Sequence, residues 1–389
     1  MNVLLLTSAM REEDFSSYQN FAKIKPNPSN QNFYSKLIKL LSLHNTVSVV
    51  SRRPFTKGMF NKLVLEQEEA VDKNIKYYYT KVECSRFYKV FLEEMVIFST
   101  AEKAIADFKS NDFIVVVDTL KISLVKAAKR IASKYNVKVV GMLTDNPLNL
   151  SNSSKLISKH LIKLVSSFDG YLSLTQGLVN VFNYSLPSYV FEGLVTEEKE
   201  GKKDPITNYF YFAGSLYERY GVKALVDAYH ESNLKYKLLI AGSGPLDKYI
   251  EKLEEEDYRI LYLSQLNKEK NIAYMRNAIA NINPRPLNKK MDSESVPSKL
   301  LEYLSLGIPV ISTKYDKLYG PFKDDVTWID GNDKEAIIKA LESYDVDMQE
   351  EHLKKAASAR RKVFEFYGLE IQAESINYFL ADINSSTRR

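Results

Sequence analysis

The chain has 389 residues, more than one hydrophobic core usually supports, so two domains are expected. Its hydrophobic content of 45% and charged content of 26% are ordinary for a soluble globular protein. Residues 1–195 hold 25 lysines and arginines against 17 acidic residues, a net of +8, whereas the remaining residues carry a net of −3. The basic half could face an anionic membrane or a phosphorylated substrate, or its lysines could simply be scattered and solvated.

Several classes of site are excluded by composition. The single cysteine, Cys84, excludes an internal disulfide framework and favours a reducing, cytoplasmic compartment. Four scattered histidines and one cysteine argue against a zinc site, and no metal is predicted. No apolar run approaches the ~20 residues that span a bilayer. The short apolar start at residues 3–6 is expected to be a first strand and not a leader sequence.

Strands and helices alternate through the first half of the chain, as in a doubly wound parallel sheet. Ligands of such sheets lie at the carboxyl ends of the strands, so Ser8, Asp118, Asp145 and Thr175 are expected at the edge of a common cleft. The polar stretch 9–29 is longer than an ordinary connection and is predicted to be a functional lid. Strands are predicted at residues 2–8, 46–51, 75–80, 113–117, 138–143 and 170–175, and helices at 30–43, 59–72, 86–109, 122–135 and 151–166. The amphipathic helix at 86–109 packs on the sheet or, alternatively, lies on a membrane surface.

A charged, glycine-bearing stretch at 197–204 is the predicted boundary between two similar α/β domains. After it the same alternation begins again. Strands are predicted at 209–213, 237–241, 259–263, 279–283, 310–313 and 326–329, and helices at 222–231, 246–255, 268–277, 333–344, 348–366 and 369–383.

The most informative stretch runs from Glu294 to Glu302, two carboxylates eight positions apart. Between them a Ser-Val-Pro-Ser turn indicates a helix start, with Pro297 in the first turn and a serine as its cap. A helix N-terminus presents unpaired N–H groups and partial positive charge, and Lys299 adds a cation. This pattern predicts a seat for a diphosphate, with a carboxylate on each side to accept hydrogen bonds from sugar hydroxyls.

Four blocks in the second half carry a resemblance to a known family. They are residues 212–222, 239–246 and 280–285, and the Glu294–Glu302 stretch together with Gly307-Ile-Pro-Val310. At these spacings residues 209–313 resemble the retaining GT-B glycosyltransferases, in particular glycosyltransferase family 4, also called group 1. The first half is similar by architecture more than by motif. Its segments 27–33, 144–147 and 189–193 look like those of a bacterial surface-polysaccharide branch.

The resemblance implies an α/β GT-B fold, in which two Rossmann-like doubly wound parallel-sheet domains face each other across a cleft. Residues 1–197 would bind the acceptor, and a C-terminal helix at about 369–389 would pack back on this domain. Residues 205–368 would bind the nucleotide-diphosphate sugar, more readily a UDP-sugar than a GDP-sugar. The implied reaction is metal-independent and cofactor-free transfer of a hexose, with retention, to a polysaccharide or lipid-linked acceptor. It would take place in the cytoplasm, at the inner face of the plasma membrane.

Matching positions imply roles for individual residues. Glu294 would bind hydroxyls of the donor sugar, and Glu302 would bind the ribose. Ser298, Lys299 and Leu300 would meet the phosphates through backbone N–H groups. The implied donor-binding set is completed by Gly214, Ser215, Arg219, Ser264, Leu266 and Arg285, with Ser264 and Leu266 near the base.

The sequence departs from the family pattern in two places. Ser215 and Tyr220 stand where the family usually has an arginine and a lysine, so Arg219, Lys299 and Arg285 would have to neutralise the diphosphate. Loss of one such stabilising group can cost about 3–4 kcal/mol. The family's N-terminal histidine is also not recognisable. The strand-end residues Asp118 and Asp145 are instead predicted, with Glu294, as the catalytic group.

Other functions are weighed against this one. A degenerate GT-B accessory subunit that binds without turnover is motivated by Ser215 and Tyr220. A nucleotide-sugar epimerase or a sugar phosphorylase on the same fold is disfavoured by the two spaced glutamates and by the lack of a lysine suited to a cofactor Schiff base. No Gly-x-Gly-x-x-Gly follows the first strand, which argues against a dinucleotide oxidoreductase. No nucleic-acid-binding module is recognisable.

Overall fold

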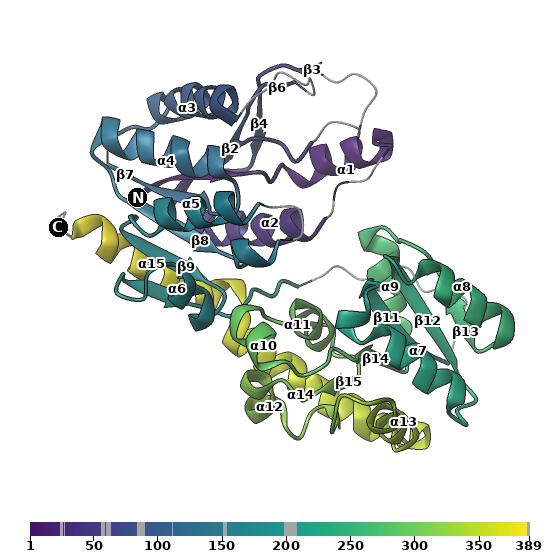
Figure 1. Ribbon diagram of the computed structural model, residues 1–389. Helices are drawn as coiled ribbons and strands as arrows, with labels where there is room; N and C mark the ends of the chain where they lie inside the picture. Colours follow the sequence, from purple (N-terminus) through teal and green to yellow (C-terminus); the bar gives the residue numbers. More distant parts are fainter. Residues whose placement is uncertain are drawn as a thin grey trace. The chain divides into compact units, whose positions relative to one another are not determined.

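A computed structural model describes residues 1–23, 26, 28–55, 59, 64–83, 90–110, 112–150, 154–197 and 208–386. Cys84 and all but the first residue of the predicted 197–204 boundary lie outside these residues. The chain forms two compact units (Figure 1). Unit 1 comprises Met1–Leu194, Ser293–Val296 and Leu369–Arg389, and unit 2 comprises Val195–Asp292 and Pro297–Gly368.

Unit 1 is built on an eight-stranded sheet with the order β10-β9-β8-β7-β1-β2-β5-β4. Its strands are β1 (Asn2–Thr7), β2 (Thr46–Ser51), β4 (Glu68–Asp72), β5 (Ile75–Tyr79), β7 (Phe113–Asp118), β8 (Val139–Leu143), β9 (Gly170–Ser173) and β10 (Ser188–Val190). All neighbouring strands are parallel except the edge strand β4, which runs antiparallel to β5. The two short strands β3 (Val64–Leu65) and β6 (Val82–Glu83) form a separate antiparallel pair.

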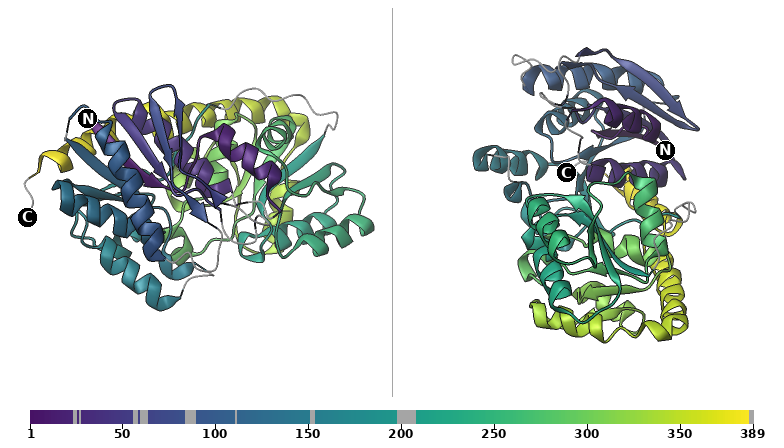
Figure 2. Two further views of the ribbon diagram at one scale, coloured as in Figure 1. Left: turned by 90° about the horizontal axis from the view of Figure 1, so that it is seen from above. Right: turned by 90° about the vertical axis from the view of Figure 1, so that its right-hand side faces the viewer.

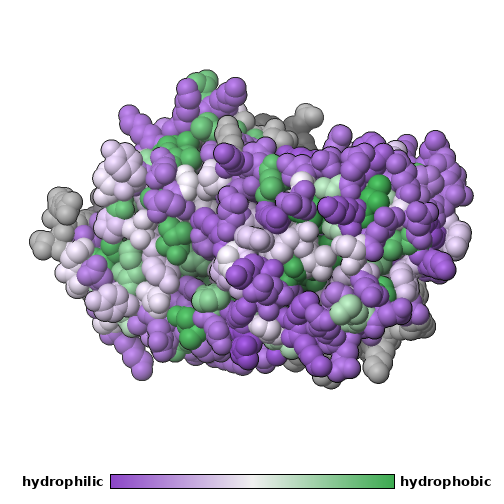
Figure 3. All heavy atoms as spheres, turned by 90° about the horizontal axis from the view of Figure 1, so that it is seen from below, coloured by the Kyte–Doolittle hydropathy of each residue, from purple (hydrophilic) through white to green (hydrophobic). Residues whose placement is uncertain are grey.

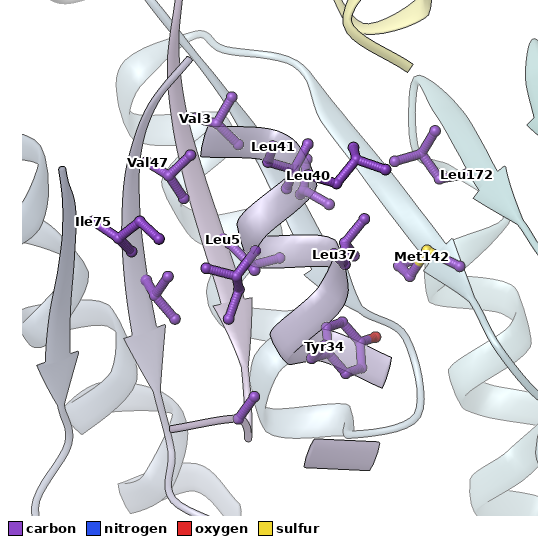
Figure 4. Close-up of a cluster of buried hydrophobic side chains, with 14 of the residues drawn as sticks. Val3, Leu5, Tyr34, Leu37, Leu40, Leu41, Val47, Ile75, Met142 and Leu172 are labelled. Atoms are coloured by element: carbon purple, nitrogen blue, oxygen red, sulfur yellow. The ribbon is translucent and has the colours of Figure 1, made fainter. Parts of the chain in front are cut away.

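Helices cover both faces of this sheet (Figure 2). On one face, α2 (Pro28–Ser42) and α15 (Leu369–Ser385) pack against each other and share a core with the strands. Figure 4 shows part of this core, where Leu37 and Leu41 of α2 meet Val3 and Leu5 of β1. On the other face lie α3 (Val90–Ala106), α4 (Ile122–Tyr135), α5 (Lys155–Val165) and α6 (Gln176–Phe182). The burial of strands on both faces explains their unbroken runs of apolar residues.

Unit 2 has a six-stranded, fully parallel sheet with the order β13-β12-β11-β14-β15-β16. Its strands are β11 (Tyr209–Ser215), β12 (Lys237–Ser243), β13 (Ile260–Tyr262), β14 (Ala280–Asn283), β15 (Val310–Thr313) and β16 (Thr327–Ile329). One face is covered by α7 (Val222–Glu231), α8 (Asp247–Glu256) and α13 (Lys334–Glu342). The other helices are α9 (Lys268–Asn277), α11 (Ser298–Ser305), α12 (Asp316–Phe322) and α14 (Gln349–Tyr367). The short helix α10 (Lys289–Glu294) ends in the segment that groups with unit 1.

Both sheets have the same kind of switch point. In unit 1 the chain builds β2, β5 and β4 on one side of β1, and then β7 to β10 on the other. In unit 2 it builds β12 and β13 on one side of β11, and then β14 to β16 on the other. Ligands of open α/β sheets bind outside the carboxyl ends of strands at such a point. Ligands are therefore expected next to the carboxyl ends of β1 and β7 in unit 1, and of β11 and β14 in unit 2.

Three sequence predictions about the fold were wrong. The stretch 9–29, predicted to be a loop, contains a helix, α1 (Glu12–Phe21), which Asp14 anchors by accepting hydrogen bonds from Arg11 and from the Tyr79 hydroxyl. Its role as a lid stays a prediction. The stretch 59–72, predicted to be a helix, contains β3 and β4 where the structure describes it. Sequence patterns also missed β10, with three residues, and the helices α6 and α12, with seven residues each, because such short elements show at most about two periods of the pattern. Local periodicity is weakest in segments of this length.

On the face shown in Figure 3, hydrophobic residues appear as small spots among polar and charged side chains. Among the described residues, no helix combines the length and the apolar character needed to cross a bilayer.

Candidate functional site

The carboxyl edge of the unit 2 sheet is shaped by glycines. Gly242, the second-last residue of β12, has a φ of +146°. A side chain at this position would overlap the Gly214 carbonyl oxygen of β11. A glycine is therefore required at 242 on two grounds, the backbone conformation and the close approach of two strands. The sequence predicted a loop from residue 214 onward, but β11 continues through Ser215. The close backbone approach consequently lies between the ends of β11 and β12.

Tyr303 of α11 ties this helix to the same edge. Its hydroxyl accepts a hydrogen bond from the Ala213 N–H at 2.9 Å and lies 3.3 Å from the Ala213 carbonyl oxygen. The ring is fully buried, and burial raises the pKa of the Tyr303 hydroxyl far above its usual value, so the group stays neutral. The residue before Gly214 is thereby fixed to the second turn of α11. Sequence reasoning did not identify Tyr303 as part of the site.

The start of α11 differs in detail from the prediction. Pro297 is the N-cap and not a first-turn residue, and no side chain makes a capping hydrogen bond to the helix. The Leu300 N–H donates to the Pro297 carbonyl at 2.9 Å. In this structure the Leu300 N–H is therefore already bound within the chain. The ammonium of Lys299 pairs with the Glu302 carboxylate at 2.6 Å. Both side chains are partly exposed, so the pair can exchange for ligand groups at little cost.

The other cations predicted for unit 2 lie near the switch point. The Arg219 guanidinium lies over the rings of Tyr217 and Tyr220, at 4.9 and 5.0 Å from their centroids. These stacking contacts restrict its position in the short helix η2 (Glu218–Tyr220), directly after β11. Arg285 follows β14, on the other side of the switch point, and pairs with Asp292 at 3.1 Å. One cation thus follows each of the two strands that flank the switch point.

The segment after β13 contains the residues predicted near the base. Ser264 has a positive φ of 55°, unusual for a residue other than glycine, and its carbonyl accepts a hydrogen bond from the Gly242 N–H at 2.9 Å. Leu266 is half-buried two positions further on. The Ser264 backbone thus adjoins the glycine edge at the end of β12. A base-binding role for either residue remains a prediction.

In unit 1, buried polar groups gather at the carboxyl edge. Asp118, at the end of β7, is fully buried and accepts hydrogen bonds from the Leu120 N–H at 2.9 Å and from the Asn30 amide at 3.3 Å. The buried Tyr34 hydroxyl of α2 faces the same carboxyl, and burial followed by the Asp118 charge raises the pKa of Tyr34. Ser8, after β1, is buried and its hydroxyl has no hydrogen-bond partner among the described residues. These groups surround the unit 1 switch point, between β1 and β7.

Asp118 and Asp145 influence each other's protonation. Burial raises the pKa of the Asp118 carboxyl. The Asp145 residue keeps exposed surface, yet dense packing around its carboxyl and the nearby Asp118 charge raise its pKa to about 6. Both shifts favour the protonated form, as expected for like charges near one another in a poorly hydrated place. Thr175, by contrast, caps α6 by accepting from the Leu178 N–H at 3.2 Å, which is a structural role.

The Glu294 carboxylate is bound within unit 1. Its Oε2 accepts hydrogen bonds from the amides of Asn146, at 3.0 Å, and Asn149, at 2.7 Å. Both asparagines belong to the turn after β8 that includes the short helix η1 (Pro147–Asn149). The preceding residue, Ser293, packs so closely on Gly177 that any side chain at 177 would overlap the Ser293 carbonyl. The 293–296 segment is thus held against unit 1 by specific contacts.

The predicted residues therefore fall into two groups. Gly214 and Ser215 end one strand of the unit 2 switch point, Arg219 follows it, and Arg285 follows the other strand, while α11 is tied to the same edge. Asp118, Asp145 and Glu294 belong to unit 1. Sequence reasoning missed the partners Tyr34, Asn30, Asn146, Asn149 and Tyr303, which only a three-dimensional arrangement reveals. Among the residues that the structure describes, no cluster of three histidine, cysteine or acidic side chains could hold a metal ion.

Comparisons with known proteins give one family-model match and a set of similar folds. Residues 196–362 match the family model of glycosyl transferases group 1. The match covers the end of β11, Arg285 and all of α11. No curated protein sequence matches the chain.

Solved structures resemble the chain along its whole length. A sucrose-phosphate synthase from Thermosynechococcus elongatus has a TM-score of 0.69 at 13% identity, with 100% of both chains covered. HepE from Anabaena, in complex with UDP, has a TM-score of 0.62 at 11% identity and covers 98% of this chain and 100% of its own. The fold is GT-B. A trehalose-6-phosphate synthase, studied for glycosyl transfer with retention, has a TM-score of 0.63 at 9% identity, with 99% and 100% covered. At such identities the likeness shows the fold alone, and it confirms the predicted pair of Rossmann-like sheets.

Proposed function

We propose that the protein is a retaining glycosyltransferase that moves a hexose from a nucleotide-diphosphate sugar, with UDP favoured over GDP, to a polysaccharide or lipid-linked acceptor. The observation that carries this proposal is the attachment of α11 to the glycine edge by Tyr303. It fixes a helix start and Lys299 relative to the switch point of a sheet whose residues match a glycosyltransferase family model. Similar folds bind UDP, as the Anabaena protein does.

The donor would be held by unit 2. The first N–H groups of α11, those of Ser298 and Lys299, have no partner within a helix and suit a phosphate. The Lys299 ammonium would leave Glu302 for the diphosphate, and the Glu302 carboxylate would then accept hydrogen bonds from ribose hydroxyls. Arg219 and Arg285, one after each switch-point strand, would add positive charge where the leaving diphosphate develops its own. Such preorganised charge is the main source of catalysis when a leaving group must be stabilised.

Unit 1 would supply the carboxyl groups and the acceptor site. Glu294, held by two asparagine amides, would accept hydrogen bonds from donor-sugar hydroxyls. Asp145, which is exposed, would contact reacting sugars at the carboxyl edge of the unit 1 sheet, whereas the buried Asp118 would act through its charge on Asp145. Retention is commonly described in this fold as front-face substitution, in which the leaving phosphate helps to deprotonate the acceptor hydroxyl. This route needs no protein nucleophile, and we assign none.

The acceptor and the cellular location belong to the same proposal. The net charge of +8 in the first half would favour an anionic membrane, so a lipid-linked acceptor at the inner face of the plasma membrane is consistent with it. The roles of residues 1–197 and 205–368 as acceptor-binding and donor-binding domains are proposed on the same grounds. Independence from metal would follow from the cations named above.

Donor binding is tested by thermal denaturation with UDP, GDP and their common sugars. A ligand present at 100 times its Kd stabilises the folded state by about 2.7 kcal/mol. We expect a rise in Tm with UDP and UDP-hexoses and a smaller one with GDP. Lys299→Ala should reduce the rise, whereas Lys317→Ala in α12 serves as a charge-matched control. If no nucleotide shifts the Tm of the parent protein, donor binding is refuted.

Turnover is tested separately, by NMR detection of donor hydrolysis and of the anomeric configuration of the product. Glu294→Gln and Glu302→Gln should each slow release of UDP. Full activity in both variants would remove these two carboxylates from the site. Transfer with inversion would refute retention while leaving donor binding intact.

A second candidate is a GT-B accessory subunit that binds a nucleotide sugar without turning it over. Ser215 and Tyr220, in place of the family's basic pair, favour it. Because Arg219 is held over Tyr217 and Tyr220, a replacement cation is nevertheless available on that loop. UDP-dependent stabilisation without hydrolysis or transfer, across a panel of acceptors, would support the accessory role over the enzyme.

A further inference from the structure

Unit 1 exposes a group of aliphatic side chains around η1 and α5. Leu156 is 80% exposed, Ile157 52%, Leu148 43% and Leu150 37%. Four large aliphatic residues are thus exposed within ten positions of the chain. Singly exposed hydrophobic residues are normal on a protein surface, but a contiguous group indicates an interaction site.

The charges on and around α5 are mainly positive. Between Asp118 and Asp169 the chain has nine lysines and arginines and one acidic residue, Asp145. The helices packed against α5, namely α4 and α6, contain no acidic residue. In the part of the chain that the structure describes, none of the three α5 lysines forms an ion pair. These lysines are Lys155, Lys159 and Lys163.

Helical geometry brings the two kinds of side chain together. With 3.6 residues per turn, Lys159 and Lys163 follow Leu156 on the same face, and Ile157 adjoins it. The opposite face, with Leu161 and Val165, is buried in the core of unit 1. The helix is also joined to η1, since the Ser158 hydroxyl donates to the Pro147 carbonyl at 2.8 Å. The exposed Leu148 and Leu150, in and just after η1, thus lie on a segment that packs beside α5.

We infer that this surface, formed by Leu148, Leu150, Leu156, Ile157 and the three α5 lysines, docks on an anionic lipid bilayer. The apolar side chains would enter the boundary between head groups and acyl chains, and the lysines would extend toward the phosphates. Charge complementarity decides the occupant. A bilayer with acidic lipids satisfies both the aliphatic residues and the three lysines of α5, whereas a second copy of this surface would bring those lysines together.

The surface continues into the candidate site. Asn146 and Asn149, which hold the Glu294 carboxylate, flank Leu148 in the same turn. A bilayer in contact with Leu148 and Leu150 would therefore lie next to the residues that bind Glu294. A lipid-linked acceptor could then reach this site without leaving the membrane, a consequence that rests on the proposed function. The docking itself does not depend on catalysis.

The test is sedimentation of the full chain with vesicles, without donor. One set contains phosphatidylcholine only, and the other contains equal parts of phosphatidylcholine and phosphatidylglycerol. We expect binding to the second set, weakening as salt is raised, because ions screen the lysines. Replacing the three α5 lysines by glutamine should weaken partitioning about a hundredfold, since each basic residue near an anionic surface contributes about fivefold.

The apolar part is tested by Leu156→Asp with Ile157→Asp, which should weaken binding at least about tenfold. Leu353→Asp, at another exposed aliphatic residue, is the matched control and should bind like the parent protein. The UDP-induced rise in Tm, measured in every variant, checks that each is folded. It also separates the two proposals, since vesicle binding can fail while nucleotide binding persists, and the reverse.

Three outcomes would overturn the inference. The first is a folded parent protein that does not bind the acidic vesicles at low salt. The second is binding that both sets of variants leave unchanged. The third is a dimer in sedimentation velocity that Leu156→Asp converts to a monomer, because a second copy would then cover the surface.

Discussion

Two carboxyl groups of unit 1, those of Asp118 and Asp145, are held in conditions that oppose their ionisation. Burial is the main cause for both, and the Asp118 charge adds to it at Asp145. Asp118 is partly compensated by hydrogen bonds from the Leu120 N–H and the Asn30 amide. Ionisation of either carboxyl therefore lowers the stability of the folded state. This is typical of groups retained for binding or proton transfer.

The pair predicts a specific pH dependence of stability. Because the folded-state pKa of Asp145, about 6, exceeds its unfolded value, the folded protein holds the proton more tightly, and stability falls as pH rises from about 4 to 6. Asp145→Asn removes this loss. The difference in unfolding free energy between variant and parent, measured with urea, should therefore move in favour of the variant as pH rises to 7. Asp324→Asn, which removes an exposed carboxylate of unit 2, is the control. A difference independent of pH would contradict the shifted pKa.

At the scale of elements, α11 and β11 act as one structure through Tyr303. Removing the hydroxyl in Tyr303→Phe leaves the buried Ala213 N–H without this partner, which costs about 1–3 kcal/mol. We expect a lower unfolding free energy and a smaller rise in Tm with UDP, because the helix start is less firmly placed. Tyr258→Phe makes the same chemical change at an exposed tyrosine and should alter neither quantity. An unchanged UDP response in Tyr303→Phe would show that the hydroxyl does not position the helix.

The same elements show what could be predicted from sequence. Long periodic segments such as α4 were predicted with their observed bounds, and strand ends identified Asp118 and Asp145 as edge residues, whereas Gly214 was implied by the family resemblance. The predictions for 9–29 and 59–72 were wrong because α1 is short and polar, and because β4 is a largely exposed edge strand that forms a hairpin with β5, the next strand along the chain. Side-chain partners such as Tyr303 and Asn146 were not predicted, for a further reason. Each contacts a residue about 90 or more positions away, and no local pattern records such a contact.

At the scale of the whole molecule, the chain does not keep each unit to one continuous stretch. After α14 in unit 2, α15 belongs to unit 1. It contributes Ala373, Ile376, Leu380 and Ile383 to the core around α2 and β1. The segment 293–296 also groups with unit 1, although helix α11 of unit 2 follows it directly. Unit 1 is therefore completed by a helix that follows unit 2 in the sequence, and its stability depends on that helix.

This dependence leads to a prediction about the two units separately. Ile376 is fully buried, so Ile376→Ala should cost unit 1 about 2–5 kcal/mol. Hydrogen exchange followed by mass spectrometry on the full chain should show faster exchange in β1, β2 and α2, with β12 and β14 unchanged. Leu341→Ala, at an equally buried residue of α13 in the unit 2 core, should give the reverse pattern. If either variant accelerated hydrogen exchange equally in both units, the two units would unfold as a single cooperative structure. Regions of a protein differ in local stability only where unfolding is not fully cooperative.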